Sequence, residues 1–263
     1  MIRIDHDNLT EAQLGAKVFH FICSPLRCID LVNGIHEKRR QLFAKANTAP
    51  CAVEDSIFVW EPVPDVCKPS ELPNCKEALK YVDVMSPNFV ELESFLGTKL
   101  TKDAGRTDTE ELNGQCLELL QPQSGSKVRA IVVRMGELGA RVITREGWTS
   151  IDAYHRPSSA NTVEEGRLTS RTKIVDPTGA GNAFLGGFCI GLLNDRSVPT
   201  LPYFEKAAMY GSVAASFAVE QVGTPILTPS QPGGTERWNE EIVQDRLKSY
   251  NRATLNHPLI GER

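Results

Sequence analysis

The chain has 263 residues, a formal net charge of −4 and 41% hydrophobic residues. A chain of this length and composition can bury a large core, and one α/β domain over residues 1–263 is the expected organisation. The slightly acidic balance provides no basic field for a phosphate backbone, so a nucleic-acid-binding protein is not expected.

Neither a membrane protein nor a secreted one is expected. No stretch reaches the eighteen consecutive apolar residues that a spanning helix needs. The seven cysteines are odd in number and form no Cys-x-x-Cys pair, which favours reduced thiols. Residues 1–8 contain charges and no apolar run, unlike a signal peptide. We therefore expect a cytoplasmic or nuclear protein.

Short apolar runs alternate with helical periods along the first half of the chain. This alternation is typical of βαβ units and predicts an α/β fold with a mostly parallel sheet. The expected strands cover residues 18–23, 57–60, 82–85 and 130–134, and the expected helices between them cover 25–41 and 70–81.

The second half contains two polar segments and two strong helices. Residues 98–127 are polar, with a helical period only at 112–120, and predict a surface excursion; residues 156–171 predict a long loop. Small and apolar residues dominate 180–193 and 202–219, which predicts two buried helices. The C-terminal part, 231–263, predicts a helix at 239–250 followed by a tail.

The most informative segment is 176–182, which reads Asp-Pro-Thr-Gly-Ala-Gly-Asn and opens directly onto the first of these two helices. Gly179, Ala180 and Gly181 have almost no side chain, so a ligand could reach their amides at the positive end of the helix. A phosphoryl group suits such a place. The alternative is an ordinary buried helix after a tight turn. Gly186, Gly187 and Gly191 weaken the helix, which predicts close approach of the sheet or of a nucleotide.

Two common phosphate motifs do not fit this segment. A dinucleotide fingerprint starting at Gly179 would require glycine at the position of Phe184, and no Walker A sequence follows. A nicotinamide-dependent oxidoreductase is therefore disfavoured.

Three further segments could contribute to a nucleotide site, and each has a simpler explanation. Asn88 and Glu91 follow a predicted strand, but Asn88 could only cap the next helix. Gly136 and Gly139 connect two predicted strands, as in any plain hairpin. The small residues of 212–225 could belong to a buried helix that stops at a glycine.

Taken in order, these segments resemble the PfkB (ribokinase-like) family of sugar and nucleoside kinases over residues 82–225. The resemblance implies a ribokinase-like α/β fold, a doubly wound, mostly parallel sheet with helices on both faces. It also implies ATP-dependent phosphoryl transfer to a sugar or nucleoside hydroxyl. It makes Gly179, Ala180 and Gly181 the anion hole and places Asn182 at the catalytic base. Its nucleotide contacts would be Asn88, Glu91, Arg134, Gly136, Gly139, Thr178, Ser212 and Ala215. Asn88 and Glu91 would hold Mg²⁺ through water, and Asp176 would lie at a monovalent cation site, for K⁺.

The sequence departs from the family in two places. The family has aspartate where this chain has Asn182, and an amide cannot accept the acceptor's proton. An inactive pseudokinase that serves as a nucleotide-binding or scaffold protein is therefore the alternative. The family's N-terminal paired glycines and β-sheet lid are not recognisable, which leaves the acceptor unnamed and a homodimer or protein partner open. The Gly-Ala-Gly-Asn variant resembles a fungal branch that includes yeast maintenance-of-killer proteins.

Overall fold

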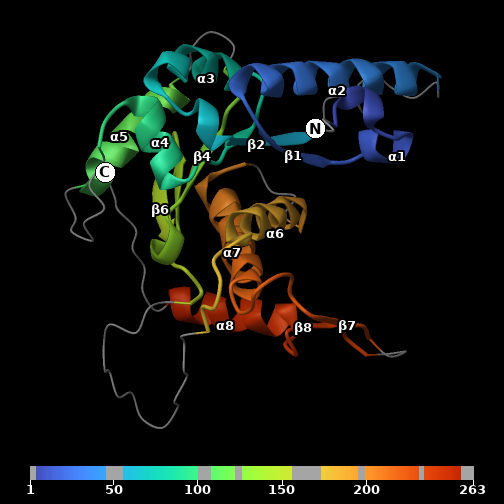
Figure 1. Ribbon diagram of the computed structural model, residues 1–263, viewed down its shortest axis with the longest axis vertical. Coiled ribbons are helices and arrows are strands. Elements are labelled where there is room, and N and C mark those ends of the chain that lie inside the picture. The colour runs from blue at the N-terminus through green and yellow to red at the C-terminus, as the bar shows by residue number, and fades with distance from the viewer. Residues whose placement is uncertain are drawn as a thin grey trace. The chain divides into compact units, whose positions relative to one another are not determined.

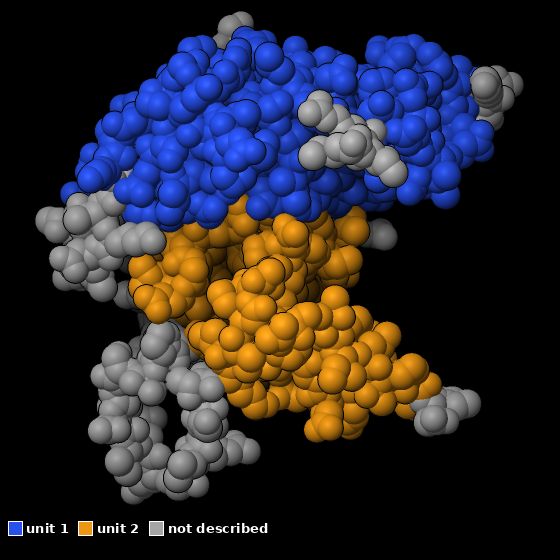
Figure 2. All heavy atoms as spheres, viewed as in Figure 1, with its two compact units in different colours: residues 1–133, 143–145 blue, residues 134–142, 146–263 orange. Residues whose placement is uncertain are grey.

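The computed structural model describes residues 4–45, 56–99, 108–121, 126–155, 173–194, 199–230 and 234–255. The chain divides into two compact units (Figure 2): unit 1 comprises residues 1–133 and 143–145, and unit 2 comprises 134–142 and 146–263. We describe each unit by itself. The expectation of one domain over the whole chain stays a prediction.

A six-stranded sheet has its strands in chain order, β1 to β6. Strands β1 to β4 pair in parallel. The turn from β4 to β5 is too short for a parallel crossover, so this pair is antiparallel. The α/β class with a mostly parallel sheet is thereby confirmed. The strands are β1 Val18–Cys23, β2 Ile57–Pro62, β3 Val84–Met85, β4 Ala130–Arg134, β5 Ala140–Thr144 and β6 Gly147–Ile151.

One part of the core of unit 1 lies between the sheet and α2, which runs along β1 and β2 (Figure 1). Phe19 and Phe58 stack with ring centroids 5.4 Å apart, and His36 of α2 meets the Phe58 ring edge-on at 5.1 Å. The helices of this unit are α1 Glu11–Leu14, α2 Pro25–Lys45, α3 Leu72–Ala78, α4 Phe89–Leu96 and α5 Asp108–Leu120, with 3-10 turns η1 His6–Asn8, η3 Pro64–Val66 and η4 Pro69–Glu71.

The core of unit 2 is a close pair of helices, α6 and α7. A Cβ on Gly187 would lie 2.6 Å from the Tyr210 carbonyl oxygen, and one on Gly191 would lie 2.6 Å from Ala207 Cα. These two glycines therefore allow α7 to approach α6 closely, whereas the sequence predicted close approach of the sheet or of a nucleotide. The unit contains η5 Gly136–Leu138, α6 Ala180–Asn194, α7 Leu201–Ala218, β7 Leu227–Thr228, β8 Arg237–Trp238 and α8 Val243–Leu255.

Two sequence predictions need correction. The supposed surface excursion contains α5, whose Leu112, Cys116 and Leu119 are buried, so its helical part belongs to the core. The C-terminal helix begins at Val243 and not at residue 239, because Asn239 and Glu240 have φ of 47° and 68°, outside the helical region. The predicted loop at 156–171 lies outside the described residues.

In the part of the chain that the structure describes, no helix combines the length and apolar character needed to cross a membrane. Six cysteines lie in this part, all of them free thiols, and five of the six are buried.

Candidate functional site

The glycine turn at residues 176–179 contains a local hydrogen bond and a glycine with positive φ. The Thr178 amide donates to Asp176 Oδ1 at 2.9 Å. Gly179 has φ of +82°, which favours glycine, and a Cβ built there would meet no atom of the described residues within 4 Å. No described side chain therefore fills the space beside Gly179.

The amides of this turn divide into two groups. Those of Ala180 and Ala183 donate to the carbonyls of Pro177 (3.1 Å) and Gly179 (2.9 Å). Among the described residues, no backbone acceptor is found for the amides of Gly179, Gly181 and Asn182. The sequence assigned the anion hole to positions 179–181, whereas the amides without a backbone acceptor among the described residues are those of 179, 181 and 182. Ala180 contributes its small size but not its N–H.

Asn182 lies in the first turn of α6, with its side chain exposed. An amide there can donate and accept hydrogen bonds but cannot titrate. Asp176 is the acidic residue of the turn, and the Thr178 amide and hydroxyl bonded to it lower the pKa of its carboxyl below the ordinary value. The turn therefore keeps a negative charge at Asp176 and has none at 182.

Arg134 lies at the carboxyl end of β4 and contacts the same helical turn. A Cβ on Gly181 would lie 2.4 Å from Arg134 Nη1, so the guanidinium lies directly against the backbone at this position. The connection that follows Arg134 is fixed by Gly139, because a Cβ at that position would lie 2.0 Å from the Ile151 carbonyl oxygen. Gly136, with φ of +63°, has open space around it. Gly139 thus has the hairpin role that the sequence left open.

Ser212 and Ala215, the nucleotide contacts expected on α7, are less exposed than Gly179. The Ser212 hydroxyl is buried and donates to the Asp152 carbonyl at 2.9 Å. The Tyr250 hydroxyl donates to that same carbonyl. Ala215 is only half-buried. A nucleotide could therefore touch Ala215, but the Ser212 hydroxyl is engaged within the protein.

In unit 1, Asn88 and Glu91 form a complete capping box at the start of α4. The Glu91 amide donates to Asn88 Oδ1 at 2.8 Å, and the Asn88 amide donates to Glu91 Oε2 at 2.7 Å. Asn88 Nδ2 donates to Glu91 Oε1 at 2.6 Å. Both carboxylate oxygens thus accept a hydrogen bond from Asn88, and the capping role that the sequence left open is real.

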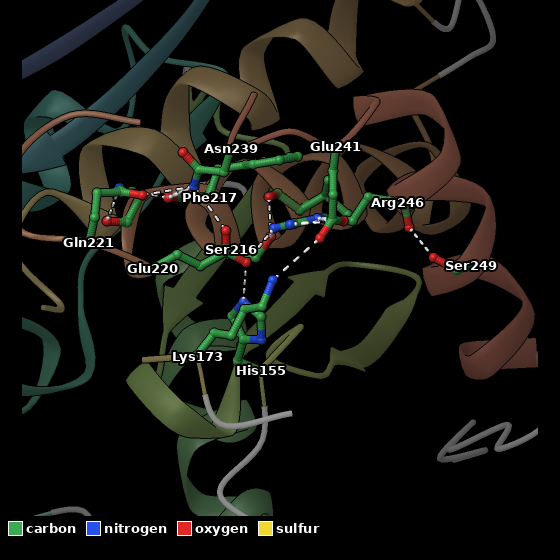
Figure 3. Close-up of polar contacts among 12 residues, drawn as sticks. His155, Lys173, Ser216, Phe217, Glu220, Gln221, Asn239, Glu241, Arg246 and Ser249 are labelled. Carbon is green, nitrogen blue, oxygen red and sulfur yellow. Dashed lines mark hydrogen bonds and ion pairs between the residues drawn. The ribbon is translucent and has the colours of Figure 1, made fainter. Parts of the chain in front are cut away.

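A buried polar network in unit 2 was missed by the sequence analysis (Figure 3). Glu220 Oε1 lies 2.9 Å from both His155 Nε2 and Arg246 Nη1. Arg246 also donates from Nε to Glu241 Oε2 at 3.0 Å and from Nη1 to Ser216 Oγ at 2.9 Å. The network joins the end of β6, the end of α7 and the start of α8.

Burial and hydrogen bonds set the protonation states of His155 and Glu220 in the network. Burial lowers the pKa of His155, although its hydrogen bond to Glu220 opposes the shift. Burial alone would raise the pKa of the Glu220 carboxyl, but hydrogen bonds from Asn239, Arg246 and His155 lower it overall. The stable state is therefore a neutral imidazole beside an ionised carboxylate and a guanidinium.

The network also supports the glycine turn. The Val219 carbonyl, next to Glu220 at the end of α7, accepts hydrogen bonds from the amides of Val175 (2.7 Å) and Asp176 (3.2 Å). The chain thus enters the turn along a helix end that the network holds. No local motif marks these residues, because they are far apart in sequence and each is ordinary in its own segment.

Comparisons with known proteins agree with this fold. The model of the pfkB family carbohydrate kinases matches residues 59–231. Protein MAK32 of Saccharomyces cerevisiae is 28% identical over 237 residues, which cover 88% of this chain and 56% of MAK32. An uncharacterized protein of Schizosaccharomyces pombe is 29% identical over 266 residues, covering 92% of this chain and 68% of that protein. Inositol 3-kinase of Arabidopsis thaliana is 27% identical over 150 residues, 56% of this chain and 33% of the kinase.

Two solved structures share the fold. Ribokinase from Giardia lamblia superposes with a TM-score of 0.57 at 19% identity, over 92% of this chain and 62% of the ribokinase. Arabidopsis thaliana ribokinase complexed with ribose and ATP has a TM-score of 0.51 at 17% identity, over 91% of this chain and 60% of that chain. The ribokinase-like fold and the likeness to the fungal branch are confirmed. The chain spans little more than half the length of MAK32.

Proposed function

This chain belongs to the pfkB family of carbohydrate kinases, and from that premise we propose that it binds ATP at the amino end of α6 and transfers the terminal phosphoryl group slowly to a sugar, nucleoside or polyol hydroxyl. One observation carries the proposal. The turn at Gly179 is open, and three amides around it, at 179, 181 and 182, have no backbone acceptor among the described residues. Such a helix end suits a phosphate.

In the proposed reaction the acceptor oxygen forms a bond to the γ-phosphorus, and the bond from that phosphorus to the bridging oxygen breaks. ADP leaves with the electron pair. The hydroxyl proton passes to water, because the Asn182 amide cannot take it. Losing a general base costs about 10² to 10⁴ in rate, or about 2.7 to 5.4 kcal/mol of barrier. Positioning and electrostatic stabilisation remain, so slow transfer is expected rather than none.

Magnesium, when bound with ATP, would neutralise phosphate charge. By the family resemblance, Asn88 and Glu91 would hold the ion through bound water; within unit 1, both Glu91 oxygens accept hydrogen bonds from Asn88. No group of three acidic, histidine or cysteine side chains suited to a metal occurs in the described segments. Asp176, whose carboxyl pKa is lowered, remains the candidate for K⁺.

The acceptor is proposed only as a class. Similarity to inositol 3-kinase adds a cyclic polyol to the sugars and nucleosides that the family resemblance suggested. A cytoplasmic or nuclear site of action, and a homodimer or protein partner, belong to the same proposal.

Asn182 favours a second candidate, a non-catalytic nucleotide-binding or scaffold protein that keeps the fold. The two candidates share the nucleotide site and differ in turnover. ADP release measured with a panel of sugars, nucleosides and inositol separates them: acceptor-dependent release supports transfer, and ATP binding without release supports the scaffold.

Calorimetric titration of the folded chain with ATP and Mg²⁺ tests the feature common to both candidates. We expect saturable binding that depends on the triphosphate. No heat of binding up to millimolar ATP, in a sample with a cooperative melting transition, would remove the nucleotide site and the proposed function with it.

A further inference from the structure

Asn239 binds the end of α7 through its side-chain amide (Figure 3). Its Nδ2 lies 2.8 Å from both Glu220 Oε2 and Gln221 Oε1, and 3.1 Å from the Phe217 carbonyl oxygen. An amide nitrogen has two hydrogens, so these three acceptors share them. The backbone of Asn239 has φ of +47°, a conformation that asparagine adopts more readily than most residues.

The same residue binds the chain a second time, at Ile226. Asn239 Oδ1 accepts a hydrogen bond from the Ile226 amide, and the Asn239 amide donates to the Ile226 carbonyl, both at 2.9 Å. Residues 222–225 lie between the two attachment points and make no hydrogen bond of their own in the part of the chain that the structure describes. Asn239 therefore closes the base of a loop, residues 221–226, whose shape depends on it.

The 221–226 loop begins beside the glycine turn. Two residues before the loop, the Val219 carbonyl accepts hydrogen bonds from the amides of Val175 (2.7 Å) and Asp176 (3.2 Å), which lead into that turn. The loop and the turn are thus attached to the same end of α7, and a ligand held at the turn has the loop as its neighbour.

The surface of this loop is apolar and uncharged. Its sequence is Gln-Val-Gly-Thr-Pro-Ile, in which Val222 is 79% exposed and Ile226 is 68% exposed. Val175, at the junction with the turn, is also largely exposed. A phosphate gains little from such a surface, whereas the flat face of a nucleotide base is favoured by covering it. The loop therefore suits the nucleoside part of a ligand whose phosphates lie at the turn.

We infer that Asn239 is a positioning residue for nucleotide binding, which holds the 221–226 loop beside the base of ATP. Its amide hydrogens are shared among protein acceptors, so Asn239 acts through the loop and not by touching the nucleotide. The inference rests on the proposed function and deepens it, because it adds a residue that shapes the nucleoside side of the site.

The first experiment compares the binding of ATP and ADP, with Mg²⁺, to the wild-type chain and to Asn239→Gly. Glycine accepts the positive φ and keeps the backbone bond to Ile226, but it removes every side-chain bond. Both nucleotides contain the same base, so we expect both affinities to fall by the same factor, roughly tenfold or more. Glu240→Gly is the matched control, because Glu240 follows in the same turn with φ of +68° and an exposed side chain. This control should bind both nucleotides like the wild type.

Amide hydrogen exchange shows where Asn239→Gly changes the chain. The Ile226 amide loses its acceptor, so exchange over residues 221–226 should become faster than in the wild type. Exchange within α6 and α7 should stay the same. Faster exchange throughout unit 2 would indicate a general structural role and would contradict positioning of the loop.

A second pair of variants tests the bond between Asn239 and Glu220. Asn239→Asp keeps the size of the side chain but places a carboxylate against Glu220 Oε2, so both nucleotides should bind more weakly. Adding Glu220→Gln exchanges the amide and the carboxylate, which again pairs a donor with an acceptor, and most of the lost affinity should return. A double variant that melts cooperatively but recovers no affinity would speak against the inference.

The outcomes separate the inference from the proposed function. If the wild-type chain binds no ATP, the proposed function fails before Asn239 is tested. If the wild type binds ATP, and a cooperatively melting Asn239→Gly binds both nucleotides as tightly or is weakened for ATP alone, the nucleotide site stands and the inference is overturned. Should Asn239→Gly not fold, the recovery of affinity in the double variant decides.

Discussion

Arg246 Nη1 lies 2.9 Å from Glu220 Oε1, and both side chains are almost completely buried, at 1% and 6% exposure. The guanidinium carbon also lies 3.7 Å from the centroid of the Phe217 ring. Charges are rarely buried so deeply unless they are paired. The pair fixes the start of α8 against the end of α7, and a single substitution can test how much it contributes.

Replacing Arg246 by alanine leaves Glu220 buried without its cationic partner. Removing one member of a buried pair typically destabilises a protein by about 3 to 5 kcal/mol, and we expect a loss in the free energy of unfolding of that order. Urea denaturation followed by circular dichroism measures it. Arg237→Ala, an exposed arginine whose Nη1 donates to the Glu240 carbonyl, is the control and should change stability by less than about 0.5 kcal/mol. Equal losses in the free energy of unfolding for the two variants would show that the buried ion pair contributes no more to stability than the exposed arginine does.

The same network predicts a specific loss of stability in mild acid. Burial depresses the pKa of His155 below its ordinary value of 6.5, so the unfolded chain binds a proton at higher pH than the folded chain does. Stability from His155 is complete above pH 6.5 and falls as the pH drops toward its folded pKa. The lowered pKa of Glu220 adds a further loss beginning near its ordinary value of 4.5.

Melting temperatures at pH 7.5 and pH 5.5 test this prediction in the wild type and in His155→Gln. The variant should be less stable at pH 7.5, yet it should lose less on acidification than the wild type. The matched control is His20→Gln, which removes a half-buried histidine paired with Glu61 in unit 1. An equal acid-induced drop in the wild type and in His155→Gln would place the sensitive group elsewhere.

Two adjacent glycines of α6 should respond in opposite ways to the same substitution. A Cβ on Gly187 would lie 2.6 Å from both Ala214 Cβ and the Tyr210 carbonyl oxygen, so Gly187→Ala should destabilise the chain by about 1 to 3 kcal/mol. A Cβ on Gly186 meets nothing within 4 Å, and Gly186→Ala should stabilise the helix by up to about 1 kcal/mol. Thermal unfolding of the two variants compares them directly. Destabilisation by Gly186→Ala would reveal a contact at this position that the structure does not show.

These glycines also show what the sequence could and could not predict. Composition marked 180–193 as a buried helix with costly glycines, but it could not tell which element approaches them. Short apolar runs predicted β1 and β4, and segments rich in small and apolar residues predicted α6 and α7, because each of these elements is continuous in sequence. The residues of the network are 155, 216, 220, 239, 241 and 246. Only folding brings them together, so no spacing rule could have found them.

The sequence predicted a glycine turn at the start of α6, but it could not show which amides of that turn already donate within the protein. Sequence spacing indicated amides at the start of a helix, but only coordinates could show that the Ala180 amide donates to the Pro177 carbonyl at 3.1 Å. Local spacing also could not show that Arg134, far earlier in the chain, reaches Gly181. By contrast, the capping box of Asn88 and Glu91 is a local pattern, and the sequence indicated both of its possible roles, a helix cap and a magnesium site.

Two substitutions of Asn88 can separate its role as a helix cap from its proposed role in binding Mg²⁺. Asn88→Ala should lower the free energy of unfolding by about 0.5 to 2 kcal/mol, whereas Asn88→Ser keeps a side-chain acceptor at the N-cap and should cost little. Denaturant unfolding of both variants tests the cap. Titration of Asn88→Ser with ATP, with and without Mg²⁺, then tests the metal. Unchanged Mg²⁺-dependent affinity would leave Asn88 as a cap alone.

Asn182→Asp is the sharpest test of how this chain differs from its family. A carboxylate at this exposed position of the first turn can accept the acceptor's proton, which the amide cannot, and we expect acceptor-dependent ADP release to rise at least tenfold. The new negative charge also repels phosphate, so ATP affinity should fall or stay level while turnover rises. Asn182→Ala, which removes both the hydrogen bonds and the shape, should show no gain. A rate that is measurable in the wild type and unchanged in Asn182→Asp would show that position 182 does not lie beside the reacting hydroxyl.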